Sequence, residues 1–132
     1  MAVRSRHYLQ GPSLPSVCDD LEASTKPLTA AIDGVSLGGD YEVAMSCHYR
    51  VASTRSAAGL SEVNLCLLPG ASGTQRLPRL IGVELAIDFM CTGAPAPAPK
   101  EGDNAAVLGQ PDLATAKVGT DLSSRRASTL TA

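Results

Sequence analysis

Two short blocks decide the fold of this chain: Lys26-Pro27-Leu28-Thr29-Ala30-Ala31-Ile32-Asp33-Gly34 and Leu37-Gly38-Gly39-Asp40-Tyr41-Glu42. In the first block, the mostly apolar run Leu28–Ile32 predicts a short buried strand, which Asp33-Gly34 stops. In the second block, a pair of glycines stands before Asp40–His48, which we expect to be a helix of about two turns. The blocks therefore predict a strand and a helix that are joined through a tight glycine turn.

Outward from these blocks, the pattern predicts further short elements. Ser16 can cap a short helix that includes Val17 and Leu21, and Lys26-Pro27 ends it because a residue before proline avoids the helical region. Downstream we expect, in order, a strand over Tyr49–Ala52, an extended or irregular segment over Gly59–Leu65, a loop over Leu67–Gly73, a helix over Thr74–Ile81 interrupted by Pro78, and an amphipathic helix over Val83–Cys91 that Gly93 stops.

The length of 132 residues fits one domain or a piece of a larger one. We expect residues 1–10 to be a loose leader and residues 11–93 to form the folded core. The alternating Ala and Pro of residues 94–99 predict an extended connector, and residues 94–112 as a whole a connector with a degraded helix. Residues 113–132, rich in Ser, Thr and Ala, are expected to be disordered.

The composition limits both the core and the partners. Aromatic residues make up only 3% of the chain, and Gly and Pro together number 21 (12 + 9), which predicts a modest core. A net charge of −2 gives no electrostatic reason to expect nucleic acid or an anionic membrane as a partner. No apolar run approaches the ~18–20 residues of a membrane span, and no signal peptide is recognisable. We therefore expect an intracellular, cytoplasmic protein.

The four cysteines are too far apart for a zinc site of ordinary spacing, and only two histidines accompany them. Cys18, Cys47 and Cys91 lie in segments with an apolar pattern, so we expect them to be small buried residues. The sequence predicts no metal site.

Three features could carry chemistry, and each also has an ordinary structural explanation. Gly38-Gly39 before a helix leaves backbone N–H groups that can bind an oxyanion, although a turn without a ligand is the more common case. Glu42 would lie in the first helical turn, where the helix dipole stabilises any carboxylate. Glu62, among apolar neighbours, is unexpected unless it is exposed or functional. Two such acids could divide the roles of general acid and general base.

The loop Gly70-Ala71-Ser72-Gly73-Thr74 is only loosely similar to a phosphate-binding loop. It lacks the Gly-Lys-Ser/Thr ending of a P-loop, and the chain contains no dinucleotide-binding glycine fingerprint. Helix capping explains this loop better, which disfavours a phosphate- or nucleotide-binding module.

Together with Gly59-Leu60-Ser61-Glu62-Val63 and Leu68-Pro69-Gly70-Ala71-Ser72-Gly73-Thr74-Gln75-Arg76-Leu77-Pro78-Arg79, the two opening blocks resemble the enoyl-CoA hydratase/isomerase (crotonase) family. The likeness is nearest to the hydratase module of multifunctional fatty-acid β-oxidation enzymes and runs from about Gly11 to Gly93. The resemblance implies an α/β fold, the crotonase ββα superhelix. It also implies that this copy is incomplete, with the N-terminal half of the family domain missing and the C-terminal helices degraded.

The resemblance further implies a hydro-lyase, an enoyl-CoA hydratase that adds water in syn fashion to a trans-2-enoyl-CoA in β-oxidation. Gly39 would supply an oxyanion-hole N–H, and Gly38 and Gly70 would help to bind the substrate. Glu42 and Glu62 would be the catalytic acids that hold water and move its protons. An acyl-CoA would be the partner, with no metal or redox cofactor because coenzyme A is part of the substrate, and the assembly would be a homotrimer or higher.

Two other functions remain open on the same residues. A catalytically inactive remnant of the crotonase fold would keep these motifs without a substrate pocket. An enoyl-CoA isomerase needs a single proton-shuttling carboxylate, so the presence of both acids favours the hydratase. Asp40 stands where the family usually has a third glycine, and we expect its charge beside Gly39 to oppose enolate formation.

Overall fold

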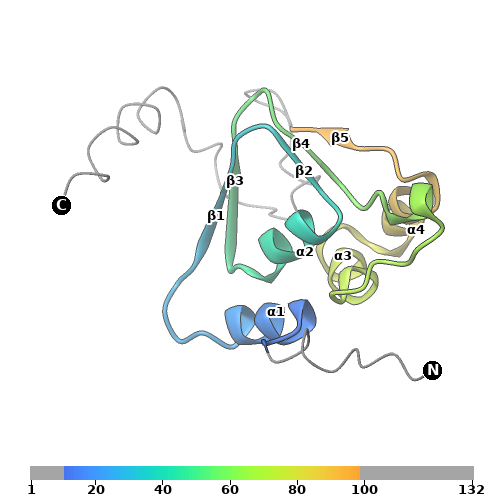
Figure 1. Cartoon of the computed structure of the whole chain (residues 1–132). Coiled ribbons are helices and arrows are strands. Elements are labelled where there is room, and N and C mark those ends of the chain that lie inside the picture. Colours follow the sequence, from blue (N-terminus) through green and yellow to red (C-terminus); the bar gives the residue numbers. More distant parts are fainter. Residues whose placement is uncertain (1–10, 99–132) are drawn as a thin grey trace, which may run out of the picture.

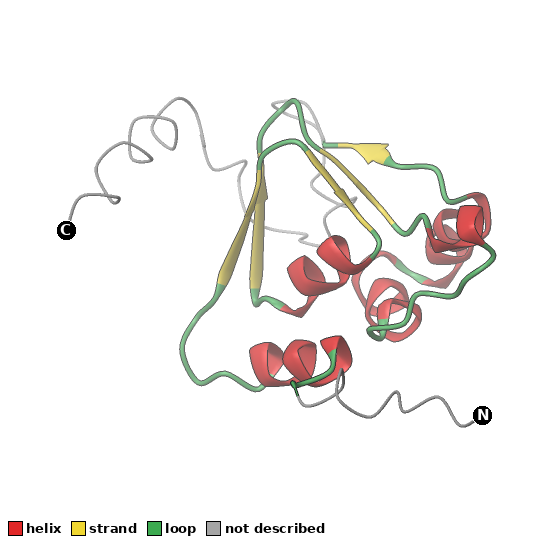
Figure 2. Cartoon of the chain, viewed as in Figure 1, coloured by secondary structure: helices red, strands yellow, loops and turns green. Residues whose placement is uncertain are grey.

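The structure is a computed structural model, and it describes residues 11–98 of the chain (Figure 1). Short strands lie on one side of the molecule and helices on the other (Figure 2). The elements along the chain are α1 (Leu14–Glu22), β1 (Thr29–Ile32), β2 (Val35–Leu37), α2 (Gly39–Ser46), β3 (Tyr49–Ala52), β4 (Ala57–Gly59), the 3-10 helix η1 (Glu62–Leu65), α3 (Gly73–Ile81), α4 (Val83–Thr92) and β5 (Ala96–Pro97).

The strands form two small sheets whose connections interleave. β1 pairs with β3 in parallel, with Thr29 opposite Tyr49, and β2 pairs with β4 in parallel, with Val35 opposite Ala57. β5 adds to β4 in antiparallel fashion. Parallel pairing requires a crossover, and α2 lies within the crossover of both parallel pairs. The start of α2 is thereby fixed between the ends of β2 and β4.

Arg50 of β3 fastens the other end of α2. Its side chain is buried, and its Nη1 donates to three carbonyls at the end of the helix, of which the Ala44 carbonyl also accepts the Cys47 N–H. These are the carbonyls of Cys47 at 2.8 Å, Met45 at 3.3 Å and Ala44 at 3.4 Å. A cation at this end also complements the helix dipole, so the contact stabilises α2.

The first helix begins earlier and ends earlier than expected. Ser13, not Ser16, is the N-cap, and its Oγ accepts the Ser16 N–H at 3.4 Å. Pro15 fits the first helical turn, where its missing N–H costs nothing, so the helix can start before it. The helix ends at Glu22 with Ala23 as C-cap, and the prediction that Lys26-Pro27 ends it is wrong.

The strand predictions are confirmed in place but not in burial. β1 and β3 form where Leu28–Ile32 and Tyr49–Ala52 predict them, but in β1 only Ile32 is buried, whereas Ala30 is partly buried against the core and the other two residues are exposed. β2 was not predicted. With three residues between Gly34 and Gly38, it is too short to show an alternating pattern.

The segment 59–65 is divided in two. β4 ends at Gly59 and η1 begins at Glu62, whereas we expected a single extended or irregular segment. The loop before α3 is confirmed, but the expected interruption at Pro78 is wrong, because α3 continues through it to Ile81. Proline removes one hydrogen bond there, and the fully buried Leu77 beside it keeps the helix packed in the core.

The last described elements confirm one expectation and correct two. Gly93 ends α4 in the left-handed conformation, with φ +62°, as expected. Cys91, however, is exposed, whereas we expected a buried thiol. The segment after Gly93 is extended as predicted, but Ala96–Pro97 is bonded to β4 as a strand instead of spanning free space. The expected leader, the rest of the connector and the expected tail lie outside the described residues.

The core is small and lies where α2, α3 and β4 meet. Tyr41, Leu60 and Leu77 are its largest fully buried apolar side chains. Smaller residues complete it: Ile32, Ala44, Met45, Ala58 and Ala86. Cys18 is also buried, Cys47 is half-buried and Cys66 is exposed, and none of these thiols is in a disulfide. No helix in the described part of the chain is long and apolar enough to cross a membrane.

Candidate active site

The glycine pair before α2 makes a tight turn that leaves a backbone donor available. Gly38 has φ +54°, a conformation that other residues rarely adopt, and its N–H donates to the Gly59 carbonyl at 2.9 Å. Its carbonyl accepts the Glu42 N–H at 2.9 Å, which closes the first turn of the helix. Among residues 11–98, the Gly39 N–H at the helix start donates to no acceptor. That N–H can therefore bind an oxygen of a ligand, with the positive end of the helix dipole behind it.

Glu62 lies directly against this turn. A Cβ built on Gly38 would stand 2.9 Å from Glu62 Oε1, so only glycine leaves room for the carboxylate. Glu62 Oε2 is buried and has no hydrogen-bond partner among the described residues. A buried polar atom without a partner is costly, and such atoms are concentrated at functional sites. The structure thus brings Gly38, Gly39 and Glu62 together.

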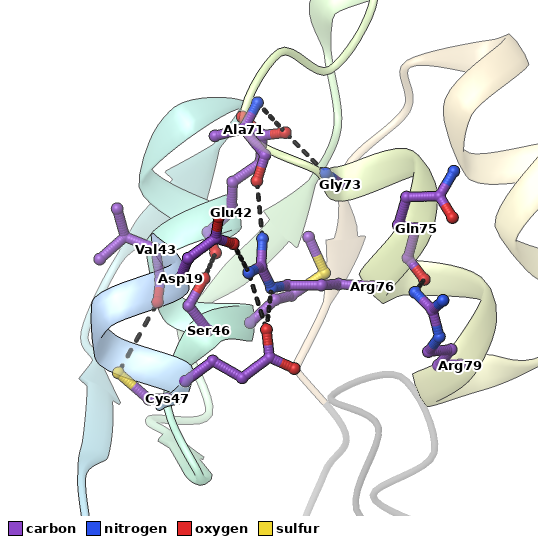
Figure 3. A network of polar contacts seen from close by, with 12 residues as sticks. Asp19, Glu42, Val43, Ser46, Cys47, Ala71, Gly73, Gln75, Arg76 and Arg79 are labelled. Atoms are coloured by element: carbon purple, nitrogen blue, oxygen red, sulfur yellow. Dashed lines mark hydrogen bonds and ion pairs between the residues drawn. The ribbon is translucent and has the colours of Figure 1, made fainter. Parts of the chain in front are cut away.

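Glu42 belongs to the same end of α2 but has very different surroundings. The side chain is 2% exposed, and its Oε1 accepts the N–H groups of Ala71 and Gly73, both at 2.8 Å (Figure 3). Gly73 is the first residue of α3, so the helix dipole adds to the attraction for the carboxylate. A Cβ on Gly73 would lie only 2.8 Å from Glu42 Oε1, which explains why glycine stands there.

Arg76 lies beside the Ala71–Gly73 turn, whose N–H groups hold the Glu42 carboxylate. Its side chain is 7% exposed, and Nη1 donates to the Ala71 carbonyl at 2.9 Å (Figure 3). Nη2 forms ion pairs with Asp19 at 2.8 Å and with Glu22 at 2.7 Å, both from α1. Burial lowers the pKa of Arg76, but its hydrogen bonds to Glu22 and Asp19 and the charge of Glu22 outweigh burial and raise that pKa above its ordinary value. The guanidinium therefore stays charged.

The remaining candidate, Gly70, is not one of the two residues whose N–H groups hold Glu42. It is exposed in the loop before Ala71, and the nearest atom to a Cβ there would be the Leu68 carbonyl oxygen at 4.0 Å. The residues that hold Glu42 are the next ones along, Ala71 and Gly73, together with Arg76 behind them. Sequence reasoning considered Ala71 and Gly73 only as parts of a capping loop, and it gave Arg76 no role of its own.

Asp40 is exposed on the first turn of α2, and it faces a separate cleft of about 390 Å³. The cleft lies between β1, β2 and α2, and neither Glu42 nor Glu62 lines it. Among the described residues, no group of three or more His, Cys, Asp or Glu side chains could hold a metal ion.

The site thus combines an available backbone N–H at a helix start with two acids near the same turn. Such a site can polarise a carbonyl oxygen and move protons on neighbouring atoms, which is the equipment of an acid–base catalyst acting on a carbonyl compound. The chain belongs to the enoyl-CoA hydratase/isomerase family, whose family model matches residues 6–110.

Individual relatives agree with this assignment. The peroxisomal bifunctional enzyme of Danio rerio is 45% identical over 136 residues, which is 93% of this chain but 18% of that protein. The fatty acid oxidation complex subunit alpha of Shewanella baltica is 53% identical over 79 residues, or 58% of this chain and 11% of that protein. This chain therefore spans less than a fifth of the length of these curated relatives.

Solved structures confirm the crotonase fold. The enoyl-CoA hydratase of Bacillus anthracis superposes with a TM-score of 0.63 at 41% identity, covering 64% of this chain and 33% of that one. An enoyl-CoA hydratase subunit of Geobacillus kaustophilus gives a TM-score of 0.59 at 46% identity, covering 61% of this chain and 32% of that one. The match thus extends over about a third of a crotonase-fold chain, which agrees with the expectation of a partial domain.

Proposed function

We propose that this chain acts as an enoyl-CoA hydratase, or as the acid-bearing part of one, on trans-2-enoyl-CoA substrates of β-oxidation. The observation that carries the proposal is the buried, unpartnered Glu62 Oε2 beside the Gly38-Gly39 turn. The names of the relatives support the substrate class, since they include enoyl-CoA hydratases and fatty-acid oxidation proteins.

The proposed reaction uses the groups at the start of α2. The Gly39 N–H binds the thioester oxygen, which draws electrons from the C2–C3 double bond and makes C3 electrophilic. Glu42, with Oε1 held by two N–H groups, uses Oε2 to take a proton from water while the water oxygen bonds to C3. The electron pair of the double bond moves into the enolate, and Glu62, acting as the acid, donates its proton to C2. The proton that Glu42 took from water returns to Glu62 before the next turnover. Water is thus added without a metal or a redox cofactor.

The test is the loss of the conjugated enoyl-thioester absorbance when purified chain is mixed with crotonyl-CoA. We expect turnover that the double variant Glu42→Ala/Glu62→Ala abolishes. Arg79→Met is the matched control, because Arg79 is exposed and its Nη1 bonds only to the Gln75 carbonyl of its own helix among the described residues. Turnover that survives in the double variant would contradict the assignment of the acids.

A second candidate is a catalytically inactive remnant of the fold. It is favoured by one observation, that the chain covers about a third of the solved hydratase chains. Folded protein without turnover, and without binding of a CoA thioester by calorimetry, would establish this candidate. Binding without turnover would instead favour an acid-bearing part that needs further residues for catalysis.

The assembly and the compartment are also parts of the proposal. We expect a homotrimer or higher, supported by large apolar side chains that remain exposed on α4 and the loop before α3, among them Leu68, Val83 and Leu85. Light scattering on a sizing column would measure it. An intracellular location is expected, and the names of several relatives favour a peroxisome or glyoxysome over the cytoplasm for those proteins. Imaging of a tagged chain in its own cells decides between the compartments.

A further inference from the structure

Arg76 is a buried cation to which the proposed mechanism assigns no step. Its guanidinium nevertheless lies one peptide away from the donors that hold Glu42, since Nη1 bonds to the Ala71 carbonyl and the Ala71 N–H bonds to Glu42 (Figure 3). Burying a charged side chain is costly unless it is paired and hydrogen-bonded. The contacts that Arg76 makes therefore indicate what it does in the fold.

The turn that Arg76 holds has an unusual backbone. Ser72 has φ +72° and ψ 18°, a left-handed conformation that costs a residue other than glycine about 1 kcal/mol or more. This turn places the Ala71 N–H before it and the Gly73 N–H after it on one oxygen, Glu42 Oε1. Successive backbone N–H groups that converge in this way form an anion-binding concavity. The bond from Arg76 to the Ala71 carbonyl fixes the peptide between Ala71 and Ser72, which is the centre of the turn.

Arg76 is itself held from α1. Asp19 and Glu22 lie one helical turn apart, and both pair with Nη2, while Glu22 also accepts from Nε at 3.1 Å. These contacts join residues that are 54 to 57 positions apart in the sequence. With two carboxylates of α1 paired to it, the guanidinium has fewer orientations, and in the one observed Nη1 reaches the Ala71 carbonyl.

We propose that Arg76 is a positioning residue for the catalytic carboxylate of Glu42, and this inference rests on the proposed function. Arg76 holds the Ala71–Gly73 turn so that its two N–H groups meet Glu42 Oε1, and Asp19 and Glu22 hold Arg76. The first helix, which carries no catalytic group, thereby takes part in aligning the site. A different role, in which Arg76 only fastens α1 to α3, predicts no particular effect at the two donors.

The two amides themselves supply the test. We would label the 132-residue chain with nitrogen-15 and measure amide shifts and hydrogen exchange in the unaltered chain, Arg76→Met, Arg76→Lys and the control Arg79→Met. In Arg76→Met, we expect the Ala71 and Gly73 amides to exchange about tenfold faster or more, because hydrogen bonds to a charged acceptor are weakened. Arg76→Lys keeps the charge but loses the paired donors of the guanidinium, so its Ala71 and Gly73 amides should exchange at an intermediate rate. In Arg79→Met these amides should exchange as in the unaltered chain.

The opposite result is equally clear. Unchanged shifts and exchange at Ala71 and Gly73 in Arg76→Met, together with faster exchange along α1, would overturn the positioning role and leave only the fastening of helices. If Arg76→Met does not fold, Asp19→Asn and Glu22→Gln, singly and together, replace it. They should accelerate exchange at the same two amides, and no change there would also overturn the proposal.

Kinetics add a readout that separates this inference from the proposed function. If the chain turns over crotonyl-CoA, Arg76→Lys should lower kcat several-fold with KM nearly unchanged, because the misplaced carboxylate acts in the transition state. If instead KM rises several-fold and kcat stays unchanged, the result would count against the positioning of Glu42. If the unaltered chain neither turns over crotonyl-CoA nor binds a CoA thioester, the proposed function fails, and the amide measurement still decides the role of Arg76.

Discussion

The two acids of the site lie near the same end of α2 and yet are held in opposite ways. Glu42 is anchored by two backbone N–H groups, and its support extends through Arg76 to the first helix. Glu62 rests against Gly38 with one buried oxygen that has no partner among the described residues. The difference indicates that the fold itself satisfies Glu42, whereas Glu62 is left for a group that the described residues do not provide. Stability should therefore depend on the first acid far more than on the second.

The largest expected effect comes from crowding the Glu42 side. A methyl group at Gly73 would meet Glu42 Oε1 at 2.8 Å, Pro69 Cβ at 3.0 Å and Leu60 Cδ1 at 3.1 Å. We expect Gly73→Ala to lower the free energy of unfolding by about 2–3 kcal/mol, measured by urea denaturation. Gly70→Ala is the control, because the nearest atom there is 4.0 Å away, and it should change stability by less than about 1 kcal/mol. Equal losses in the two variants would contradict the tight fit around Glu42.

A smaller effect compares the acids directly. Glu42→Gln weakens two charge-assisted hydrogen bonds, and we expect a loss of about 1–2 kcal/mol in the free energy of unfolding. Glu62→Gln replaces a carboxylate that has one unpartnered buried oxygen in the described chain with a neutral amide, which is less costly to bury, so stability should stay within about 0.5 kcal/mol or rise. Calorimetric unfolding of both variants under one condition makes the comparison. The contrast between the acids is wrong if Glu62→Gln costs as much as Glu42→Gln.

A still smaller effect concerns backbone strain, which both sides of the site contain. Ser72, in the turn whose N–H groups hold Glu42, has φ +72°, and Cys66 at the end of η1 has φ +56°. Glycine relieves this strain but makes the unfolded chain more flexible, so Ser72→Gly and Cys66→Gly should each raise stability by about 0.5 kcal/mol. Melting temperatures would show it. A clear loss of stability in Ser72→Gly alone would mean that the Ser72 side chain helps to hold the turn around Glu42, although it makes no capping hydrogen bond.

The smallest effect is a difference in thiol reactivity. Burial raises the pKa of Cys47 above its ordinary value of 9.0, and Arg50 only partly opposes this. Since the thiolate is the nucleophile, a raised pKa means less thiolate at pH 8. Cys47 should therefore react with iodoacetamide more slowly than the exposed Cys66, and its rate should still rise with pH above 9. Peptide mass spectrometry after timed labelling gives both rates, and equal rates would show that the end of α2 opens readily.

The sequence predicted the strands and helices whose signals are local. β1, β3, α2 and the end of α4 at Gly93 lie where the apolar runs and glycines place them. What it missed depends on distant partners. β2 has only three residues and exists because β4 pairs with it, and the start of α1 depends on a choice between two nearby serines, Ser13 and Ser16. Such choices are decided by tertiary packing and by proline geometry, which a periodic pattern does not express.

The sequence likewise predicted only some of the residues of the candidate site. Gly38-Gly39, Glu42 and Glu62 carry recognisable signals, and the structure places them at one end of α2. Arg76 gave no signal, because an arginine in a short helix is expected to be exposed. Its pairing with Asp19 and Glu22, 57 and 54 residues away, explains its burial, and neither local pattern nor spacing reports a contact over such a separation.

The ion pairs of Arg76 have one more consequence, which concerns salt. The arginine is buried, but its partners Asp19 and Glu22 remain 70% and 64% exposed, so mobile ions reach one side of each pair. At an ionic strength of 1 M the Debye length falls to about 3 Å, and the attraction that holds α1 against α3 weakens. The alignment of a carboxylate that is itself 2% exposed thus depends on the electrolyte around the first helix.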